Sequence, residues 1–567
     1  MKYTRLGDLL VGSGAITKEQ LSAALEKQKE SGQRLGATLI ESGVVTEKQV
    51  IEALMTQLGL DYVDLNTTEL SADMAKLLPK NLAQKYQVVP IRATRTELYL
   101  AMADPLNFVA IEAVSAATHR QVIPMIAASA AVERAVQNLY SSQGTMKAIE
   151  DMRRDLAGSA ALSAVPVKER WKMDAAEADE EAAPTIRLVN SIIERACTEN
   201  ASDIHLEPVG ERMRIRMRID GVLRDIITVP RELQNSVISR IKIMAQMDIT
   251  QKQLPQDGRI ELSVRQEAVD LRVSTLPTIY GEKIVIRLLR RNEDISVDGI
   301  GLRGENRKRF LDLLDGSTDG MILVVGPTGA GKTSTLYTMI DHKRSDEVNL
   351  VSLEDPVEYH IDGVNQVQIN ERTYLTFASA LRAVLRQDPD IIAVGEIRDG
   401  ETAQIAVRAA LTGHLVLSTV HTTDALAAID RLLDIGVEPF LISSALRGIV
   451  SQRLVRKICP HCREAYTPTE GEVQLLGLNA AEKHTFYRGA GCSECFGTGY
   501  RGRTGVFEIL PITADIRRAI HDRSRAALEK ALAATAFRPL REDCSDLVRD
   551  GVTTVEEVLH TIGRREA

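Results

Sequence analysis

The segment Gly326-Pro-Thr-Gly-Ala-Gly-Lys-Thr333 directly follows the apolar run Met-Ile-Leu-Val-Val at 321–325 and constrains the fold more than any other part of the chain. An apolar strand, a glycine-punctuated loop and a Lys-Thr pair that opens a helix form a phosphate-binding loop. Backbone N–H groups and the helix N-terminus face the polyphosphate, and the glycines allow its close approach. The sequence therefore predicts an α/β fold that binds ATP or GTP.

Every position of this loop is a predicted nucleotide contact, namely Gly326, Pro327, Thr328, Gly329, Ala330, Gly331, Lys332 and Thr333. Lys332 is expected to reach the β- and γ-phosphates, and Thr333 to hold Mg²⁺. A chance glycine loop is the alternative. It is disfavoured because the full motif stands in the strand-to-helix context that nucleotide binding requires.

Three further apolar runs end in polar groups, at Glu354, Glu396 and His421. Near-continuous Val, Ile and Leu runs separated by helical stretches predict a parallel sheet covered on both faces. Ligands gather at the carboxyl ends of such strands, so these groups should converge on the γ-phosphate.

Hydrolysis needs a group that orients or deprotonates water, acidic groups around the metal and cations against the developing charge. Glu396 is the candidate for activating water, because it follows the buried run 391–394 almost immediately. Glu354, Asp355 and Glu358 are expected to position Mg²⁺ or its waters, and His421 to sense the γ-phosphate. Singly, each has a structural alternative, such as capping a helix or bonding a backbone group.

Four arginines alternate along one predicted strand before the phosphate loop, Arg212, Arg214, Arg216 and Arg218. Alternation places all four on one face of the strand. Two interpretations remain open: an anion-facing surface, or the solvated outer face of a half-buried strand.

The first 57 residues contain a repeat with an offset of 29 positions, in which Arg5-Leu6-Gly7 recurs as Arg34-Leu35-Gly36 and Gln28 recurs as Gln57. Each copy is predicted to form two short helices. Gly14 suits the left-handed residue that ends a helix, and Thr17 with Gln20 has the spacing of a capping box.

Four of the six cysteines form two pairs, Cys459 with Cys462 and Cys492 with Cys495. Each pair has the two-residue spacing that presents two thiolates to a tetrahedral Zn²⁺, so a structural zinc site is predicted. A redox pair on a thioredoxin-like unit is the alternative, and no such unit is visible. Cys197 and Cys544 are predicted core residues.

The formal net charge of −8 disfavours a broad surface for nucleic acid, so direct nucleic-acid binding is not expected. No apolar run approaches the roughly 18 residues of a membrane span, and the N-terminus leads into no secretory segment. The chain is therefore expected to be cytoplasmic, with membrane contact through partners.

Composition and pattern divide the chain into four parts. The predicted units are an N-terminal regulatory or docking domain at 1–140, split into a helical repeat at 1–57 and a small α/β unit at 58–140; a linker at 141–184; an arginine-bearing α+β domain at 185–292; and a nucleotide-binding domain at 293–567 with a four-cysteine insertion at 455–505.

The phosphate loop, Glu354-Asp-Pro-Val-Glu358, Val394-Gly-Glu-Ile-Arg-Asp399 and the segment 412–422 together resemble the nucleotide boxes of the type II secretion and type IV pilus assembly ATPases (GspE/PilB-like). The resemblance extends over nearly the whole chain. It implies a RecA-like P-loop motor domain preceded by a small α+β (PAS-like) domain, working as a homo-hexamer on an inner-membrane platform protein to assemble pilins or pseudopilins.

The same resemblance implies that Arg216 and Arg218, with Arg240, reach the nucleotide phosphates from the domain before the motor. The chain departs from ordinary P-loop proteins in one respect, because Gly395-Glu396 stands where an aspartate usually closes the second acidic box. That departure leaves the division of roles between Glu396 and Glu358 open.

The N-terminal repeat resembles the cyclic-di-GMP-binding module (MshE-N-like) of some of these ATPases. The resemblance implies ligand contacts at Arg5, Leu6, Gly7, Gln28, Arg34, Leu35, Gly36 and Gln57. A guanidinium can stack on guanine or bond its O6/N7 edge, and two related arginines suit a two-fold symmetric ligand. The alternatives are helical hairpins that share a core, or a docking surface for a membrane partner.

Two other functions compete with a motor ATPase. A nucleotide-gated scaffold with little turnover is disfavoured by the intact Lys332, Glu396 and His421. A DNA-translocating motor is disfavoured by the acidic balance and by the lack of interleaved aromatic and basic residues.

Overall fold

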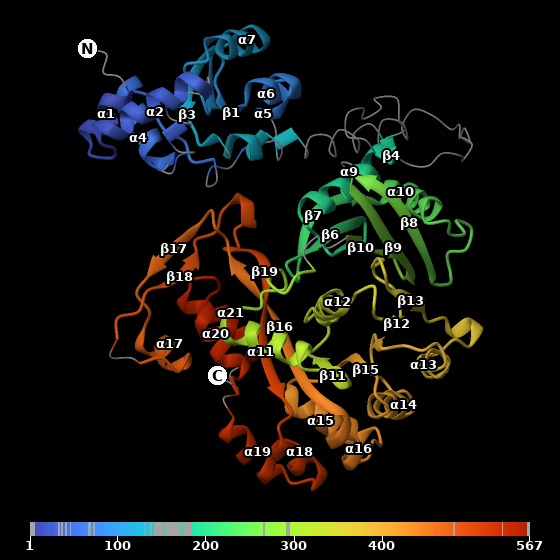
Figure 1. Cartoon of the computed structure of the whole chain (residues 1–567). Helices are drawn as coiled ribbons and strands as arrows, with labels where there is room; N and C mark the ends of the chain where they lie inside the picture. Colours follow the sequence, from blue (N-terminus) through green and yellow to red (C-terminus); the bar gives the residue numbers. More distant parts are fainter. Residues whose placement is uncertain are drawn as a thin grey trace.

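The structure is a computed structural model (Figure 1). It describes residues 6–31, 35, 38–39, 42, 44–45, 47–65, 68, 70–71, 74–129, 131–136, 139–140, 152, 172–173, 184–264, 267–290, 295–479, 482–535 and 537–563. In the described part of the chain, no helix is both long and apolar enough to cross a membrane.

The motor domain is built on a seven-stranded sheet in the order β13-β12-β14-β15-β11-β16-β19. Its strands are β11 (Gly320–Val325), β12 (Leu350–Glu354), β13 (Asn365–Gln368), β14 (Ile391–Val394), β15 (Leu415–Val420), β16 (Leu446–Ile458) and β19 (Tyr500–Pro511). All neighbours are parallel except β16 and β19. The predicted parallel sheet is thus confirmed, with one antiparallel edge strand added.

Helices cover both faces of this sheet. One core packs α11 (Gly304–Asp315) and α12 (Lys332–Lys343) against the strands. The opposite core contains residues of α13 (Phe377–Val384), α14 (Gly400–Leu411), α15 (Ala425–Asp434), α16 (Pro439–Ala445) and α18 (Ala514–His521). The strands are apolar on both sides because both sides are covered, which explains their continuous hydrophobic runs.

The arginine-bearing domain has a second seven-stranded sheet, in the order β4-β8-β9-β10-β5-β6-β7. Its strands are β4 (Lys172–Met173), β5 (Asp203–Val209), β6 (Arg212–Ile219), β7 (Val222–Pro230), β8 (Gln256–Val264), β9 (Glu267–Thr278) and β10 (Gly281–Arg290). Helices α9 (Pro184–Thr198) and α10 (Arg231–Met244) share a core with one face of it. The short strand β4 and the buried Met152 lie within the predicted linker, so this segment is not wholly without structure.

On β6 the apolar residues are buried and the arginines point to the other face, as the alternation predicted. The same face carries charged residues from neighbouring strands, including His205, Glu207 and Lys283, which lie close to Arg216. The arginines therefore belong to a charged sheet surface rather than to an isolated strand.

The N-terminal domain has a three-stranded sheet of β1 (Val88–Ala93), β2 (Glu97–Met102) and β3 (Gln121–Ile126), with helices α5 (Met74–Leu77), α6 (Lys80–Tyr86) and α7 (Phe108–Thr118). The repeat before it contains α1 (Leu6–Gly12), α2 (Lys18–Ser31) and α4 (Glu47–Leu58). Gly14 is left-handed with φ 75°, and Thr17 and Gln20 exchange capping hydrogen bonds of 2.8 and 3.2 Å. The predicted cap of the first copy is confirmed.

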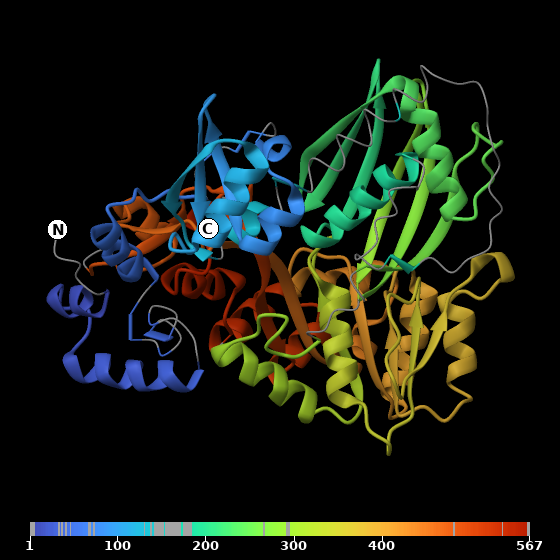
Figure 2. The same cartoon turned by 90° about the horizontal axis from the view of Figure 1, so that it is seen from above.

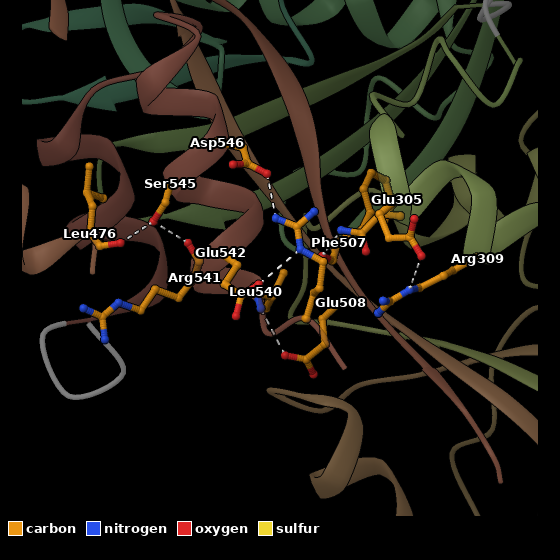
Figure 3. A network of polar contacts seen from close by, with 12 residues as sticks. Glu305, Arg309, Leu476, Phe507, Glu508, Leu540, Arg541, Glu542, Ser545 and Asp546 are labelled. Carbon is orange, nitrogen blue, oxygen red and sulfur yellow. Dashed lines mark hydrogen bonds and ion pairs between the residues drawn. The ribbon is translucent and has the colours of Figure 1, made fainter. Parts of the chain in front are cut away.

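The C-terminal part wraps around β16 and β19. It contains β17 (Arg463–Tyr466), α17 (Glu470–Leu475), β18 (Phe486–Gly489), the 3₁₀ turn η2 (Ser493–Cys495), and helices α18, α19 (Arg525–Ala534), α20 (Leu540–Arg549) and α21 (Val555–Ile562). The other 3₁₀ turn, η1 (Glu371–Thr373), lies between β13 and α13 of the motor domain. Figure 3 shows α20 held by polar contacts, in which the Ser545 hydroxyl donates to the carbonyl of Leu476.

Glu508 of β19 fixes two of these helices. Its buried carboxylate accepts from the N–H of Ala425, the first residue of α15, at 3.3 Å. It also accepts from the N–H of Leu540, the first residue of α20, at 3.2 Å (Figure 3). Helix α20 begins after Pro539, whose side chain provides no capping bond. A carboxylate from a distant strand therefore satisfies the helix N-terminus in place of a local cap.

Glu508→Ala is expected to lower the free energy of unfolding by about 2–4 kcal/mol, because it leaves buried N–H groups without their charged acceptor. In a thermal unfolding experiment this loss should lower the transition temperature by roughly 5–10 °C. Glu542→Ala is the matched control: Glu542 pairs with Arg538 on the exposed side of α20, and such a pair contributes at most about 1 kcal/mol. Equal effects of the two substitutions would contradict the anchoring role.

Candidate functional site

The phosphate loop connects the buried strand β11 to α12, which begins at Lys332. Gly329 and Gly331 are left-handed, with φ of 80° and 84°. A Cβ on Gly331 would lie 2.9 Å from the side-chain nitrogen of Gln452, and Gln452 also accepts a hydrogen bond from Thr335 at 2.5 Å. The glycines are thus needed both for the loop conformation and for its packing against β16.

A cavity of about 520 Å³ opens in front of this loop. The predicted site residues that line it are Thr328, Gly329, Ala330, Gly331, Lys332, Thr333, Glu354, Asp355, Glu358, Glu396 and His421. The strand ends after β12, β14 and β15 therefore meet the phosphate loop, as the parallel sheet predicted. Gly326 and Pro327 lie just behind, with their carbonyls 2.9 and 3.0 Å from the Lys332 Nζ atom.

Lys332, His421 and Glu396 form a chain of polar contacts. Lys332 Nζ lies 3.3 Å from Nδ1 of His421, and Nε2 of His421 lies 3.3 Å from a Glu396 oxygen. The ammonium group can only donate, so Nδ1 accepts and Nε2 carries the proton that faces Glu396. Burial lowers the pKa of Lys332, while the Glu396 carboxylate opposes that shift. The other Glu396 oxygen pairs with Arg398.

Glu354 has a different environment from Glu396. Its buried carboxylate accepts from Tyr337, from Ser352 at 2.6 Å and from Gln366 at 3.0 Å. Tyr337 in turn accepts the N–H of Glu358 at 3.1 Å. The structure therefore uses Glu354 to fix α12 against the loop that carries Glu358.

Glu358 lies at the edge of the cavity, where the arginine-bearing domain touches the motor domain. Burial raises the pKa of Glu358, and the nearby Arg272 and Arg287 partly oppose this. Arg272 donates to the carbonyl of Val357 at 2.8 Å and lies 3.7 Å from the Glu358 carboxylate.

Sequence reasoning missed several residues of this site, among them three polar side chains that come from other strands and from the second domain. Ser202 of the arginine-bearing domain and Arg503 of β19 line the cavity, and Arg272 of β9 contacts its rim. Arg272 alternates with buried apolar residues along β9, as the arginines of β6 do along β6. The sequence therefore contained a pattern that places Arg272 on the polar face of its strand. The pattern alone does not say which strand faces the motor.

The three arginines that were predicted to reach phosphates lie elsewhere in this chain and do not line the cavity. Arg216 pairs with Glu207 at 2.7 Å, and with Lys283 it lowers the pKa of that carboxyl to about 2 although burial acts to raise it. Arg218 donates to the carbonyl of Gly221 at 2.9 Å and lies 3.6 Å from Asp203. Arg240 is on α10, where burial lowers its pKa.

The four predicted zinc ligands come together in the insertion between β16 and β19. Sγ atoms of Cys459 and Cys492, and of Cys462 and Cys495, are 3.8 Å apart, and all four lie within 4.8 Å of one another. Four thiolates placed tetrahedrally about 2.3 Å from Zn²⁺ are separated by about 3.8 Å, so the cluster fits this metal.

The thiol of Cys495 ionises more readily than an ordinary cysteine, because its pKa is lowered. Burial acts to raise its pKa, but the N–H groups of Cys492 and Gly499 stabilise the thiolate and bring the pKa to about 7. Metal binding requires thiolates, so these donors favour it. As predicted, Cys544 is a core residue in the C-terminal part of the chain, and Cys197 packs against the core of the arginine-bearing domain.

The predicted cyclic-di-GMP contacts are only partly within the described residues. Arg5, Arg34 and Gly36 lie outside them. Leu6 and Leu35 pack against the apolar core of the repeat, and Gln28 and Gln57 are half-buried. A Cβ on Gly7 would lie 2.7 Å from the Leu21 side chain, so helix packing by itself accounts for this glycine.

Comparison with known protein families assigns the chain to one of them. Residues 178–560 match the model described as "Type II/IV secretion system protein", and residues 58–146 match the MshEN domain. The chain belongs to the type II/IV secretion system protein family. It is a P-loop ATPase of that family with an MshEN domain, as the resemblance implied. The match to that domain falls on residues 58–146, after the repeat at 1–57 on which the resemblance rested.

Individual relatives support this assignment. The chain is 42% identical to the type IV pilus assembly ATPase PilB of Thermus thermophilus over 98% of its own length, and spans 65% of that protein. It is 47% identical to the type II secretion system protein E of Pseudomonas aeruginosa, with 74% of this chain and 83% of the relative covered. The Legionella pneumophila ATPase DotB has the same fold, with a TM-score of 0.50 and 20% identity over 65% of this chain and 93% of DotB.

Proposed function

We propose that this protein is a cytoplasmic mechanochemical ATPase that couples ATP hydrolysis to assembly of a type IV pilus or a type II secretion pseudopilus. It works as a homo-hexamer on an inner-membrane platform protein. The observation that carries the proposal is the cavity lined by the phosphate loop and three strand ends, with Ser202 of a second domain at its wall. A site shared by two domains lets nucleotide state change their relative position, which a motor requires.

Within this cavity the roles follow from the geometry. ATP with Mg²⁺ supplies the phosphoanhydride bond and the charge that polarises it. Lys332 contacts the loop carbonyls and would exchange them for phosphate oxygens, and Thr333, which lines the cavity, would hold Mg²⁺. Glu396 accepts from Nε2 of His421 and orients the attacking water, while His421 links it to Lys332. Glu358 and Asp355, which line the cavity, would hold Mg²⁺ or its waters.

Lys332→Ala is expected to abolish nucleotide binding, because it removes the cation that faces the phosphates. Glu396→Gln should keep ATP bound but lower kcat by about 10²-fold or more, since an amide cannot accept the proton of water. Calorimetric binding and steady-state phosphate release on the purified full-length chain measure both. Equal loss of binding in the two variants would show that Glu396 has another role, and wild-type protein without turnover would favour a nucleotide-gated scaffold.

We also propose that the four-cysteine cluster holds one structural Zn²⁺ per chain, through Cys459, Cys462, Cys492 and Cys495. The Sγ separations and the N–H donors to Cys495 support this. The cluster does not line the nucleotide cavity, so the metal acts on structure rather than on chemistry.

Metal analysis of the purified protein should give close to one zinc per chain. Cys459→Ser should release the metal and lower the unfolding temperature more than it changes nucleotide affinity, because it breaks a closed tetrahedral site. Cys197→Ser, outside the cluster, should retain the metal. A fully stable protein without zinc would refute the structural role.

The N-terminal region is proposed to bind cyclic di-GMP, which would make the motor responsive to a second messenger. The MshEN match at 58–146 and the preceding repeat with its two arginines support this. Caps and apolar packing explain most repeated positions, including Gly7, but they do not explain an arginine at the start of both copies.

Titration calorimetry of the full-length chain with cyclic di-GMP should give a 1:1 isotherm in the micromolar range or tighter. The Arg5→Ala/Arg34→Ala double variant should weaken binding by at least about tenfold, since each guanidinium contact contributes about 1–3 kcal/mol. If no heat is released, or if the double variant binds as tightly as the wild type, the two arginines do not bind cyclic di-GMP and the repeat has only a structural role.

A further inference from the structure

The segment 492–502, which we call the cysteine loop, contacts the arginine-bearing domain directly. Arg224 of β7 donates to the carbonyl of Cys495 and to the Thr498 hydroxyl, both at 3.2 Å, and its guanidinium lies 5.0 Å from the centre of the Phe496 ring. Beside it, Asp220 accepts the N–H of Gly502 at 2.8 Å. The hairpin formed by β6 and β7 thus binds the loop at 495–498 and again at Gly502.

The chemistry of this contact requires arginine. A planar guanidinium can bond two acceptors at once and stack on an aromatic ring, whereas the ammonium group of lysine cannot do all three. The Arg224 side chain is half-buried between the two parts of the chain. A cation partly withdrawn from water needs its acceptors in place, so it helps to fix the position of the loop and the domain relative to each other.

The arginine-bearing domain also reaches the nucleotide cavity, through Ser202 and through Arg272 of β9. Register partners run across its sheet from Leu223 on β7 through Arg218, Asp203 and Arg287 to Arg272 on β9. Four strand spacings of about 4.8 Å place the β7 contact roughly 19 Å from Arg272. Ser202, one residue before this row, lines the cavity, and Arg272 bonds Val357 at its rim.

The arginine-bearing domain therefore contacts the motor both at the cysteine loop and at the cavity rim. With a lever of roughly 19 Å, a tilt of about 5° at the first point displaces Arg272 by roughly 1.7 Å. Displacements of about 1 Å at a reaction centre can cost up to about 10²-fold in rate. A shift at the contact of Arg224 with the cysteine loop would therefore move Arg272 at the cavity rim.

We propose that Arg224 and Asp220 are positioning residues for the nucleotide site, and that the cysteine loop is the seat that orients the arginine-bearing domain over the cavity. The inference rests on the proposed ATP turnover. It assigns the four-cysteine insertion a task in addition to local stability: a rigid loop gives Arg224 fixed acceptors. Figures 1 and 2 show the green arginine-bearing domain lying against the motor domain, whose sheet is drawn in yellow and orange.

A second contact of the cysteine loop supplies a control. Glu494 has little exposure and pairs with Arg501 and, at 2.8 Å, with Arg134 of the N-terminal domain. Glu494→Gln removes this charge pairing without changing the acceptors of Arg224. Arg231→Ala is the second control, because Arg231 is an exposed arginine of the same domain that pairs with the exposed Glu211.

The first measurement is steady-state phosphate release and nucleotide binding on the full-length chain. Arg224→Ala should lower kcat about tenfold with nucleotide affinity changed less than about twofold, because the phosphate loop is untouched. Arg224→Lys should recover part of the loss, and Arg231→Ala should match the wild type. A loss of nucleotide affinity equal to the loss of kcat would overturn the proposal, since it would indicate general damage.

The second measurement is a double-mutant cycle with Arg272→Ala. If Arg224 acts by placing Arg272, its substitution should cost less than about twofold once Arg272 is absent. Independent, additive effects of about tenfold each would overturn the proposal.

The third measurement does not depend on ATP turnover. Hydrogen exchange of the backbone amides at 495–502 and in β7 should accelerate at least about tenfold in Arg224→Ala but not in Arg231→Ala or Glu494→Gln. Unchanged exchange would refute the seating role even if the protein proved to be inactive. Accelerated exchange in a chain without turnover would instead overturn the proposed function alone.

Discussion

The placement of the Lys332 ammonium group beneath the phosphate loop is the constraint on which the nucleotide site depends. A cation buried to this extent needs acceptors, and it finds them in the carbonyls of Gly326 and Pro327 and in His421. Those acceptors exist together only if β11 and β15 are adjacent and parallel, which brings the ends of both strands to one edge. The strand order of the motor sheet and the chemistry of its site are therefore linked by one side chain.

The acidic groups around this lysine have separate roles because their surroundings differ. Glu354 is saturated by hydroxyl and amide donors and acts inside the motor domain, whereas Glu396 faces His421 and Arg398 at the cavity. Glu358 stands where the second domain meets the first, beside Arg272. The environment of Glu358 therefore depends directly on how the two domains are docked.

Much of this arrangement could be predicted from the chain. The loop glycines, the strand-end residues at Glu354, Glu396 and His421, and the two cysteine pairs are local patterns with fixed chemical requirements, and the structure brings each set together. The arginines could not be predicted in the same way. Arg216 and Arg272 both alternate on β-strands, but only the docking of the sheet onto the motor puts Arg272 at the cavity and leaves Arg216 with Glu207.

By itself, the sequence determined the α/β motor fold, the nucleotide class and the thiolate cluster, because hydrophobic period, glycine placement and ligand spacing act over short stretches of chain. Tertiary structure decided the antiparallel edge strand, the capping of α20 by Glu508 and the contact of Arg224 with the cysteine loop. These features join residues that are far apart in sequence, and their energies arise from burial and charge satisfaction that exist only after the domains have packed.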